Sequence, residues 1–130
     1  QDNIASRNFL SNSGKILISN KDFHFQIRSI FLQGLLLTKS KFLNRKFENL
    51  TFFLDELEKR SKEIDSSTLG ICLSYFNLLP SNTNLILGVN SVEHFNQILK
   101  TEIPELEVDF FNSLPEVDNN LLDPRNWTSA

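Results

Sequence analysis

Only two segments of this chain have the pattern of a β-strand, and this scarcity constrains the fold more than any other feature. Residues 23–30, FHFQIRSI, alternate as a strand does when one of its faces is buried. Residues 85–89, LILGV, form a continuous apolar run, which is typical of a strand buried on both faces of a parallel sheet. Two such strands would each leave an unpaired apolar edge, so we expect further strands to complete the sheet.

Helical spacing predicts most of the remaining structure. Apolar residues recur every three or four positions over residues 47–64, which predicts a helix of about five turns. A second helix is predicted after Asp65, Ser66 and Ser67, which are good N-cap types, and Pro80 ends it. A further helix is expected over about 104–114, and a short one near the start of the chain is expected to end near Asn20.

Another helix is predicted directly after the second strand. Ser91 can cap its N-terminus. The apolar residues that follow recur at helical spacing and are expected to face inward: Val92, Phe95, Ile98 and Leu99. Strands that alternate with helices indicate right-handed parallel crossovers, here within a single domain over residues 1–130.

Composition excludes several classes of protein. The 130 residues carry a formal net charge of −3 without a stripe of Lys and Arg, so no nucleic acid is expected as a partner. The apolar runs are far below the roughly 20 residues that a membrane helix needs, so no membrane contact is expected. A single cysteine, Cys72, cannot form an internal disulfide, which suits a reducing, cytoplasmic location.

The first strand and the turn after it carry a resemblance to a known family. Residues 28–37, RSIFLQGLLL, are similar to the end of the seventh barrel strand of the aldo-keto reductases, where a pattern like Ser-Pro-Leu-Gly-Gln-Gly-Leu-Leu is usual. Residues 69–99 resemble the penultimate helix, eighth strand and following helix of that family. The start, DNIASRNF, resembles the segment after its sixth strand. The ending, LLDPRNW, is similar to that of a bacterial branch often associated with surface-polysaccharide gene clusters.

The resemblance implies a fold and an activity. The fold would be α/β, a partial (β/α)₈ TIM barrel comprising the C-terminal half, about strands 7–8 with their helices. A whole barrel takes about 250 residues, and this chain has no methionine. We therefore expect processing or truncation, and a barrel completed by missing residues or by oligomerisation. The activity would be the NAD(P)H-dependent reduction of aldehydes or ketones, with this chain as the cofactor-binding part.

Eight residues would bind the cofactor by position in the family patterns. Glycine lets the backbone approach a phosphate closely, and backbone N–H groups, hydroxyls and a helix N-terminus favour anions. The two sets are Ser29, Phe31, Gln33 and Gly34 after the first strand, and Gly88, Asn90, Ser91 and His94 after the second. The plainer alternatives are a turn at Gly34, a strand-end cap at Gln33 and a simple N-cap at Ser91.

Two departures from the family pattern bear on the cofactor. His94 stands where Gln is usual, and Ile98 stands where Asn is usual near the adenine. No Lys or Arg follows Gly88 to pair with a ribose 2′-phosphate, so the choice between NADP and NAD stays open.

No catalytic residue and no metal site are expected in the chain. The family's catalytic Asp, Tyr, Lys and His belong to the other half of its barrel. Tyr75 lies in a helical pattern and is expected to pack, and His24 and His94 lack the spacing of metal ligands.

One alternative to the reductase function is a non-catalytic half-barrel that self-associates or binds another protein. In that case the association would bury Phe23, Phe25, Ile27, Leu85, Ile86 and Leu87. Another is a remnant of a broken gene that still folds.

Overall fold

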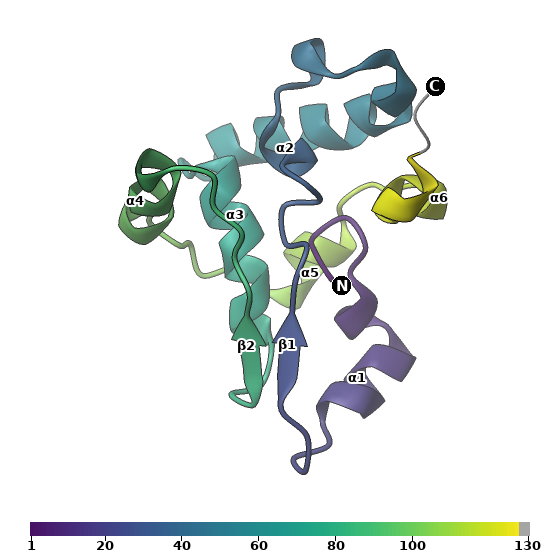
Figure 1. Cartoon of the computed structure of the whole chain (residues 1–130), viewed down its shortest axis with the longest axis vertical. Helices are drawn as coiled ribbons and strands as arrows, with labels where there is room; N and C mark the ends of the chain where they lie inside the picture. The colour runs from purple at the N-terminus through teal and green to yellow at the C-terminus, as the bar shows by residue number, and fades with distance from the viewer. Residues whose placement is uncertain (128–130) are drawn as a thin grey trace.

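The structure, a computed structural model, describes residues 1–127 and is mainly helical (Figure 1). The two strands are β1, Phe25–Ile27, and β2, Thr83–Leu85. The helices are α1, Asn12–Ile18; α2, Thr51–Glu63; α3, Thr68–Ser74; α4, Val92–Lys100; α5, Val108–Asn112; and α6, Asn119–Leu122. Short 3₁₀ helices span Asn8–Leu10, Leu35–Leu37, Ser40–Phe42, Arg45–Leu50, Tyr75–Leu78 and Pro124–Asn126.

The two strands form a parallel pair, as the alternation of strands and helices predicts. Phe25 lies opposite Thr83, and Ile27 opposite Leu85. The ladder continues for one bond beyond β2, because the Ile86 N–H donates to the Ile27 carbonyl over 2.8 Å. β1 is shorter than the predicted 23–30, because the chain bends away at Ser29, which has a left-handed φ of 68°. The prediction for the second strand was wrong in place and burial: β2 overlaps 85–89 only at Leu85, and Ile86, Leu87 and Val89 are 49%, 36% and 41% exposed.

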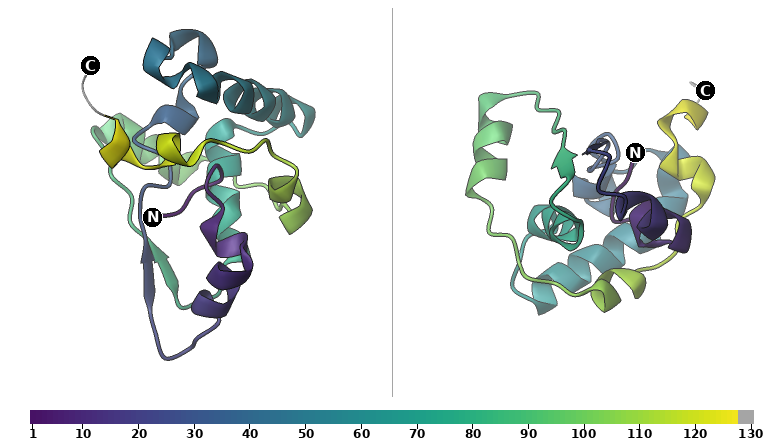
Figure 2. Two further views of the ribbon diagram at one scale, coloured as in Figure 1. Left: turned by 90° about the vertical axis from the view of Figure 1, so that its right-hand side faces the viewer. Right: turned by 90° about the horizontal axis from the view of Figure 1, so that it is seen from below.

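The expected partial (β/α)₈ TIM barrel, with strands 7–8 and their helices, is wrong. The only sheet among residues 1–127 has two strands of three residues each, which cannot form a barrel wall. The helices do not form an outer layer around a sheet. Instead, α2 packs across α3, and α3 runs beside the strands through the middle of the molecule (Figures 1 and 2).

The core is therefore built mainly by helices. Ser67 caps α3 by accepting a hydrogen bond from the Gly70 N–H, and all residues from Leu69 to Ser74 are buried. The helix predicted over residues 47–64 is present as a 3₁₀ turn followed by α2. Five of the six residues expected on its inward face are buried: Phe47, Leu50, Leu54, Leu57 and Ser61. The sixth, Ile64, is exposed, and Phe53 is buried although it was not expected to be. Burial of each large apolar side chain contributes roughly 1.5–3 kcal/mol.

The N-terminal segment is tied to α3 and its 3₁₀ extension by a buried carboxylate. The Tyr75 hydroxyl donates to Asp2 over 2.7 Å, as does the Ser6 hydroxyl. Tyr75 also packs edge-on against Phe76 and Phe111, with ring centroids 5.0 and 5.4 Å apart. The expectation that Tyr75 is a packing residue is confirmed.

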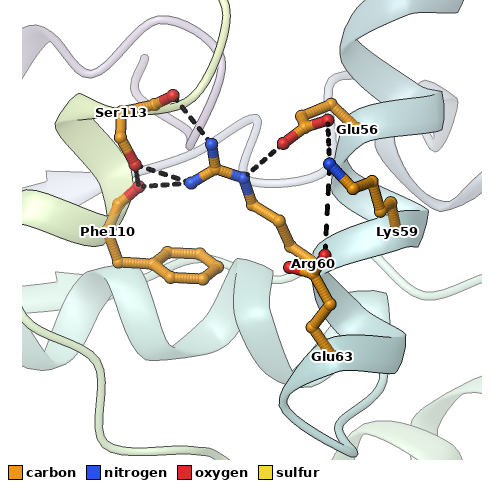
Figure 3. A network of polar contacts seen from close by, with 6 residues as sticks. All are labelled: Glu56, Lys59, Arg60, Glu63, Phe110 and Ser113. Atoms are coloured by element: carbon orange, nitrogen blue, oxygen red, sulfur yellow. Dashed lines mark hydrogen bonds and ion pairs between the residues drawn. The ribbon is translucent and has the colours of Figure 1, made fainter.

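The α2 and α5 helices are joined through the guanidinium of Arg60 (Figure 3). Arg60 Nε lies 2.8 Å from Glu56, and its terminal nitrogens donate to the hydroxyl and carbonyl oxygens of Ser113 over 2.6 and 3.0 Å. The helix expected over 104–114 is only five residues long: it begins at Val108, four residues later than expected, and Arg60 binds the turn that ends it. Beyond it, Trp127 packs on Phe47 with ring centroids 4.8 Å apart.

The exposed face of α4 differs from the prediction. Ser91 caps this helix as expected, but only Ile98 is buried. Val92, Phe95 and Leu99, expected to face inward, are 70%, 48% and 66% exposed. Among the described helices, none is long and apolar enough to cross a membrane.

Candidate functional site

A hollow of about 350 Å³ lies where the chain leaves the carboxyl ends of both strands. In Figure 1 the two arrowheads point to the same end of the sheet, and the chain beyond β2 leads to α4. Seven of the eight residues singled out from sequence line the hollow: Ser29, Phe31, Gln33, Gly34, Gly88, Asn90 and His94. Two segments far apart in the chain thus meet at one site, because β1 and β2 are parallel neighbours.

The loop after β1 has an unusual backbone. Ser29, Leu32 and Gln33 have φ angles of 68°, 47° and 56°, and Gly34 follows at 85°. Non-glycine residues in this left-handed region are strained, and such strain tends to occur at functional sites. The N–H groups of Phe31, Gln33 and Gly34 make no hydrogen bond within residues 1–127, and all three residues line the hollow.

Ser29 is placed at the hollow, but its hydroxyl is not presented to it. The Ser29 carbonyl accepts hydrogen bonds from the Asn3 side chain and from the Leu32 N–H, over 3.2 and 3.0 Å. The hydroxyl oxygen is buried and has no hydrogen-bond partner in the part of the chain that the structure describes. It would have to change rotamer to donate to a ligand.

The segment after β2 offers an open backbone and the N-terminus of α4. A Cβ atom added at Gly88 would meet nothing within 4 Å, and the φ angle of Gly88 is not left-handed. The packing of this chain therefore does not require glycine there. Ser91 is engaged as the N-cap, since its hydroxyl accepts from the His94 N–H over 3.0 Å. Of the eight residues, Ser91 alone does not line the hollow.

An aromatic pair joins the two segments across the hollow. The ring centroids of Phe31 and His94 lie 6.5 Å apart, with a tilt of 48° between the rings. Phe31 is buried and His94 is half-buried, so the imidazole forms part of the wall. The position of His94 near Phe31 could not be read from sequence, because it depends on how α4 docks.

Arg28 also lines the hollow and was not among the residues singled out from sequence. It lies in the stretch RSIFLQGLLL, but the strand alternation placed it opposite Ser29 and no family pattern drew attention to it. No Asp or Glu of residues 1–127 lines the hollow.

The titratable side chains outside the hollow do not form a second reactive or metal-binding site among residues 1–127. Burial raises the pKa of the Cys72 thiol to about 12, so the thiol stays protonated and unreactive. Burial, together with the nearby Asp2 carboxylate, also raises the pKa of the Tyr75 hydroxyl, which lies in the core. No group of His, Cys, Asp and Glu in the described part of the chain has the arrangement of a metal site.

No family model matches this chain, and searches of curated proteins and of solved structures found no match. Any function has to be argued from the residues of the hollow.

Proposed function

We propose that the hollow binds the pyrophosphate of NADP or NAD, and that the chain is the cofactor-binding part of an NAD(P)H-dependent oxidoreductase. The substrate would be an aldehyde or ketone, as the resemblance to the aldo-keto reductases implies. One observation carries the proposal. The two segments chosen from sequence as phosphate-binding meet at a single hollow.

The chemistry of the lining supports an anionic ligand. The free N–H groups of Phe31, Gln33 and Gly34 can donate to phosphate oxygens. The N-terminus of α4 adds the positive end of a helix dipole near the segment after β2. Gly88 leaves space for an oxygen to approach the backbone, and no carboxylate of residues 1–127 lies on the lining to oppose an anion.

The residues would hold the cofactor and would not carry out the chemistry. A bound nicotinamide supplies a hydride to a carbonyl carbon. The loop after β1 and the turn before α4 would bind and orient its phosphates, and we assign no catalytic residue to the chain. No Lys or Arg follows Gly88, so the proposal includes both NADP and NAD. It also places the protein in the cytoplasm, where a lone buried thiol such as Cys72 stays reduced.

The proposal is tested by titrating the protein with NADPH, NADH and inorganic pyrophosphate in a calorimeter. Gly88→Ala adds one methyl group to the hollow without a clash in the protein. We expect this variant to keep the thermal midpoint of the parent and to bind at least tenfold more weakly. Ser13→Thr, which adds a methyl group on the exposed surface of α1, is the matched control. Absence of dinucleotide binding by the parent would refute the proposal.

A second candidate is a non-catalytic module that pairs with another copy of itself. The observation that favours it is the exposed apolar stripe of α4, formed by Val92, Phe95 and Leu99. This function predicts a dimer of the 15.0 kDa chain in analytical ultracentrifugation that Phe95→Glu converts to a monomer. A monomer at every concentration tested would exclude it.

A further inference from the structure

We infer that Arg28 pairs with a phosphate group of the ligand held in the hollow. This inference deepens the proposed function and rests on the hollow being a ligand site. It adds a binding residue that neither the strand pattern nor the family resemblance indicates.

Arg28 is an arginine whose side chain has no partner in the part of the chain that the structure describes. Its side chain is exposed, lines the hollow, and makes no ion pair or hydrogen bond with residues 1–127. Most other arginines of the chain are engaged. Arg7 donates to the Ile4 carbonyl, Arg60 binds Glu56 and Ser113, and Arg125 binds Asp123. The guanidinium of Arg28 is therefore available to a ligand.

The backbone of Arg28 is nevertheless held in place. The preceding residue, Ile27, is 1% exposed and pairs with Leu85 in the sheet. The Arg28 carbonyl accepts from the Asp2 N–H over 3.3 Å, and Asp2 is itself buried. A backbone that is already fixed lowers the conformational cost of binding, which is then confined to ordering the side chain.

The electrostatics of the hollow favour a phosphate group at Arg28. None of the described Asp and Glu residues lines the hollow, so the charge of Arg28 is not neutralised locally. The free N–H groups of Gln33 and Gly34 belong to the same loop. A guanidinium binds two phosphate oxygens at once, which the neutral amides of Gln33 and Asn90 cannot reproduce.

The phosphate could belong to a dinucleotide or be a free phosphate compound, and calorimetry separates these sources. The probes are inorganic pyrophosphate, NADH and NADPH. The variants are Arg28→Gln and Arg28→Lys, with Arg45→Gln as control, because Arg45 is also exposed, does not line the hollow and carries the same charge. All three substitutions are on the surface, so the fold is expected to survive, and circular dichroism melts check this.

We expect Arg28→Gln to weaken pyrophosphate binding by about tenfold or more, which is typical of a lost charge-assisted hydrogen bond. Arg28→Lys keeps the charge but cannot make the bidentate contact of a guanidinium. Its affinity for pyrophosphate should lie between those of the parent and Arg28→Gln. Arg45→Gln should bind as the parent does.

The outcomes distinguish this inference from the proposed function. If the parent binds pyrophosphate but neither dinucleotide, and Arg28→Gln loses this binding, the inference stands and the proposed function fails. If the parent binds NADH or NADPH and Arg28→Gln binds equally well, the inference fails and the proposed function stands. Equal weakening by Arg28→Gln and Arg45→Gln, or no binding of any probe by the parent, would also overturn the inference.

Discussion

At the scale of single residues, the most consequential polar group is the Asp2 carboxylate. It has no exposed surface and accepts four hydrogen bonds, two from the Ser6 and Tyr75 hydroxyls and two from the N–H groups of Asn8 and Phe9. A buried charge is tolerated only when it is fully hydrogen-bonded, and these donors provide that. The N-terminal segment is thus part of the core structure.

Replacing this carboxylate should destabilise the whole chain. Asp2→Ala would leave the Tyr75 hydroxyl and the N–H groups of Asn8 and Phe9 without an acceptor. Leaving the buried Tyr75 hydroxyl unsatisfied costs about 1–3 kcal/mol, and the loss at the part-buried Asn8 and Phe9 N–H groups adds to it, so we expect a loss of about 3 kcal/mol or more in urea unfolding. Asp22→Ala, which removes an exposed carboxylate, is the control and should change the free energy of unfolding by less than about 0.5 kcal/mol. Equal losses in the two variants would contradict this role of Asp2.

The buried thiol of Cys72 gives a prediction about pH. Burial raises its pKa from 9.0 to about 12 in the folded protein, so unfolding releases a proton above pH 9. The buried thiol therefore does not lower the free energy of unfolding below pH 9. Between pH 9 and about 12 the free energy of unfolding falls as the pH rises. We expect native Cys72 to resist a thiol reagent at pH 8.5 and to react rapidly in urea. Rapid labelling of the native protein would show that the thiol is accessible.

At the scale of elements, α4 illustrates what helical spacing can and cannot predict. The spacing of apolar residues correctly indicates a helix, and the Ser91 cap marks its start. The same spacing does not say which part of the apolar face meets the core. Only Ile98 does so, because α4 lies at the side of the molecule beyond β2 (Figure 2).

A matched pair of substitutions on α4 tests this placement. Ile98→Ala should cost about 2 kcal/mol or more in urea unfolding, because it empties a buried site. Leu99→Ala removes a side chain of similar size that is 66% exposed, and should change the free energy of unfolding by less than about 0.5 kcal/mol. If the two substitutions cost the same, α4 packs with the face predicted from sequence.

At the scale of the whole molecule, the prediction of a partial barrel was wrong because it required more strands than residues 1–127 form. Alternating strands and helices fit a parallel barrel, but they also fit a helical domain with one small parallel pair. The latter is found, with a core centred on the wholly buried segment Leu69–Ser74. The direction of β1 and β2 was nevertheless predicted correctly, and this direction brings Gly34 and Gly88 to one hollow.

Features that depend on near neighbours along the chain could be predicted from the amino-acid sequence. The cap at Ser91, the start of a helix directly after residues 65–67 and most of the buried stripe of α2 follow from side chains three or four residues apart. Contacts between distant segments bring Asp2 to Tyr75, leave Arg28 without a partner among residues 1–127, and leave three of the four apolar residues of α4 that were expected to face inward exposed. These features depend on contacts between distant segments, and no local pattern records which surfaces will meet.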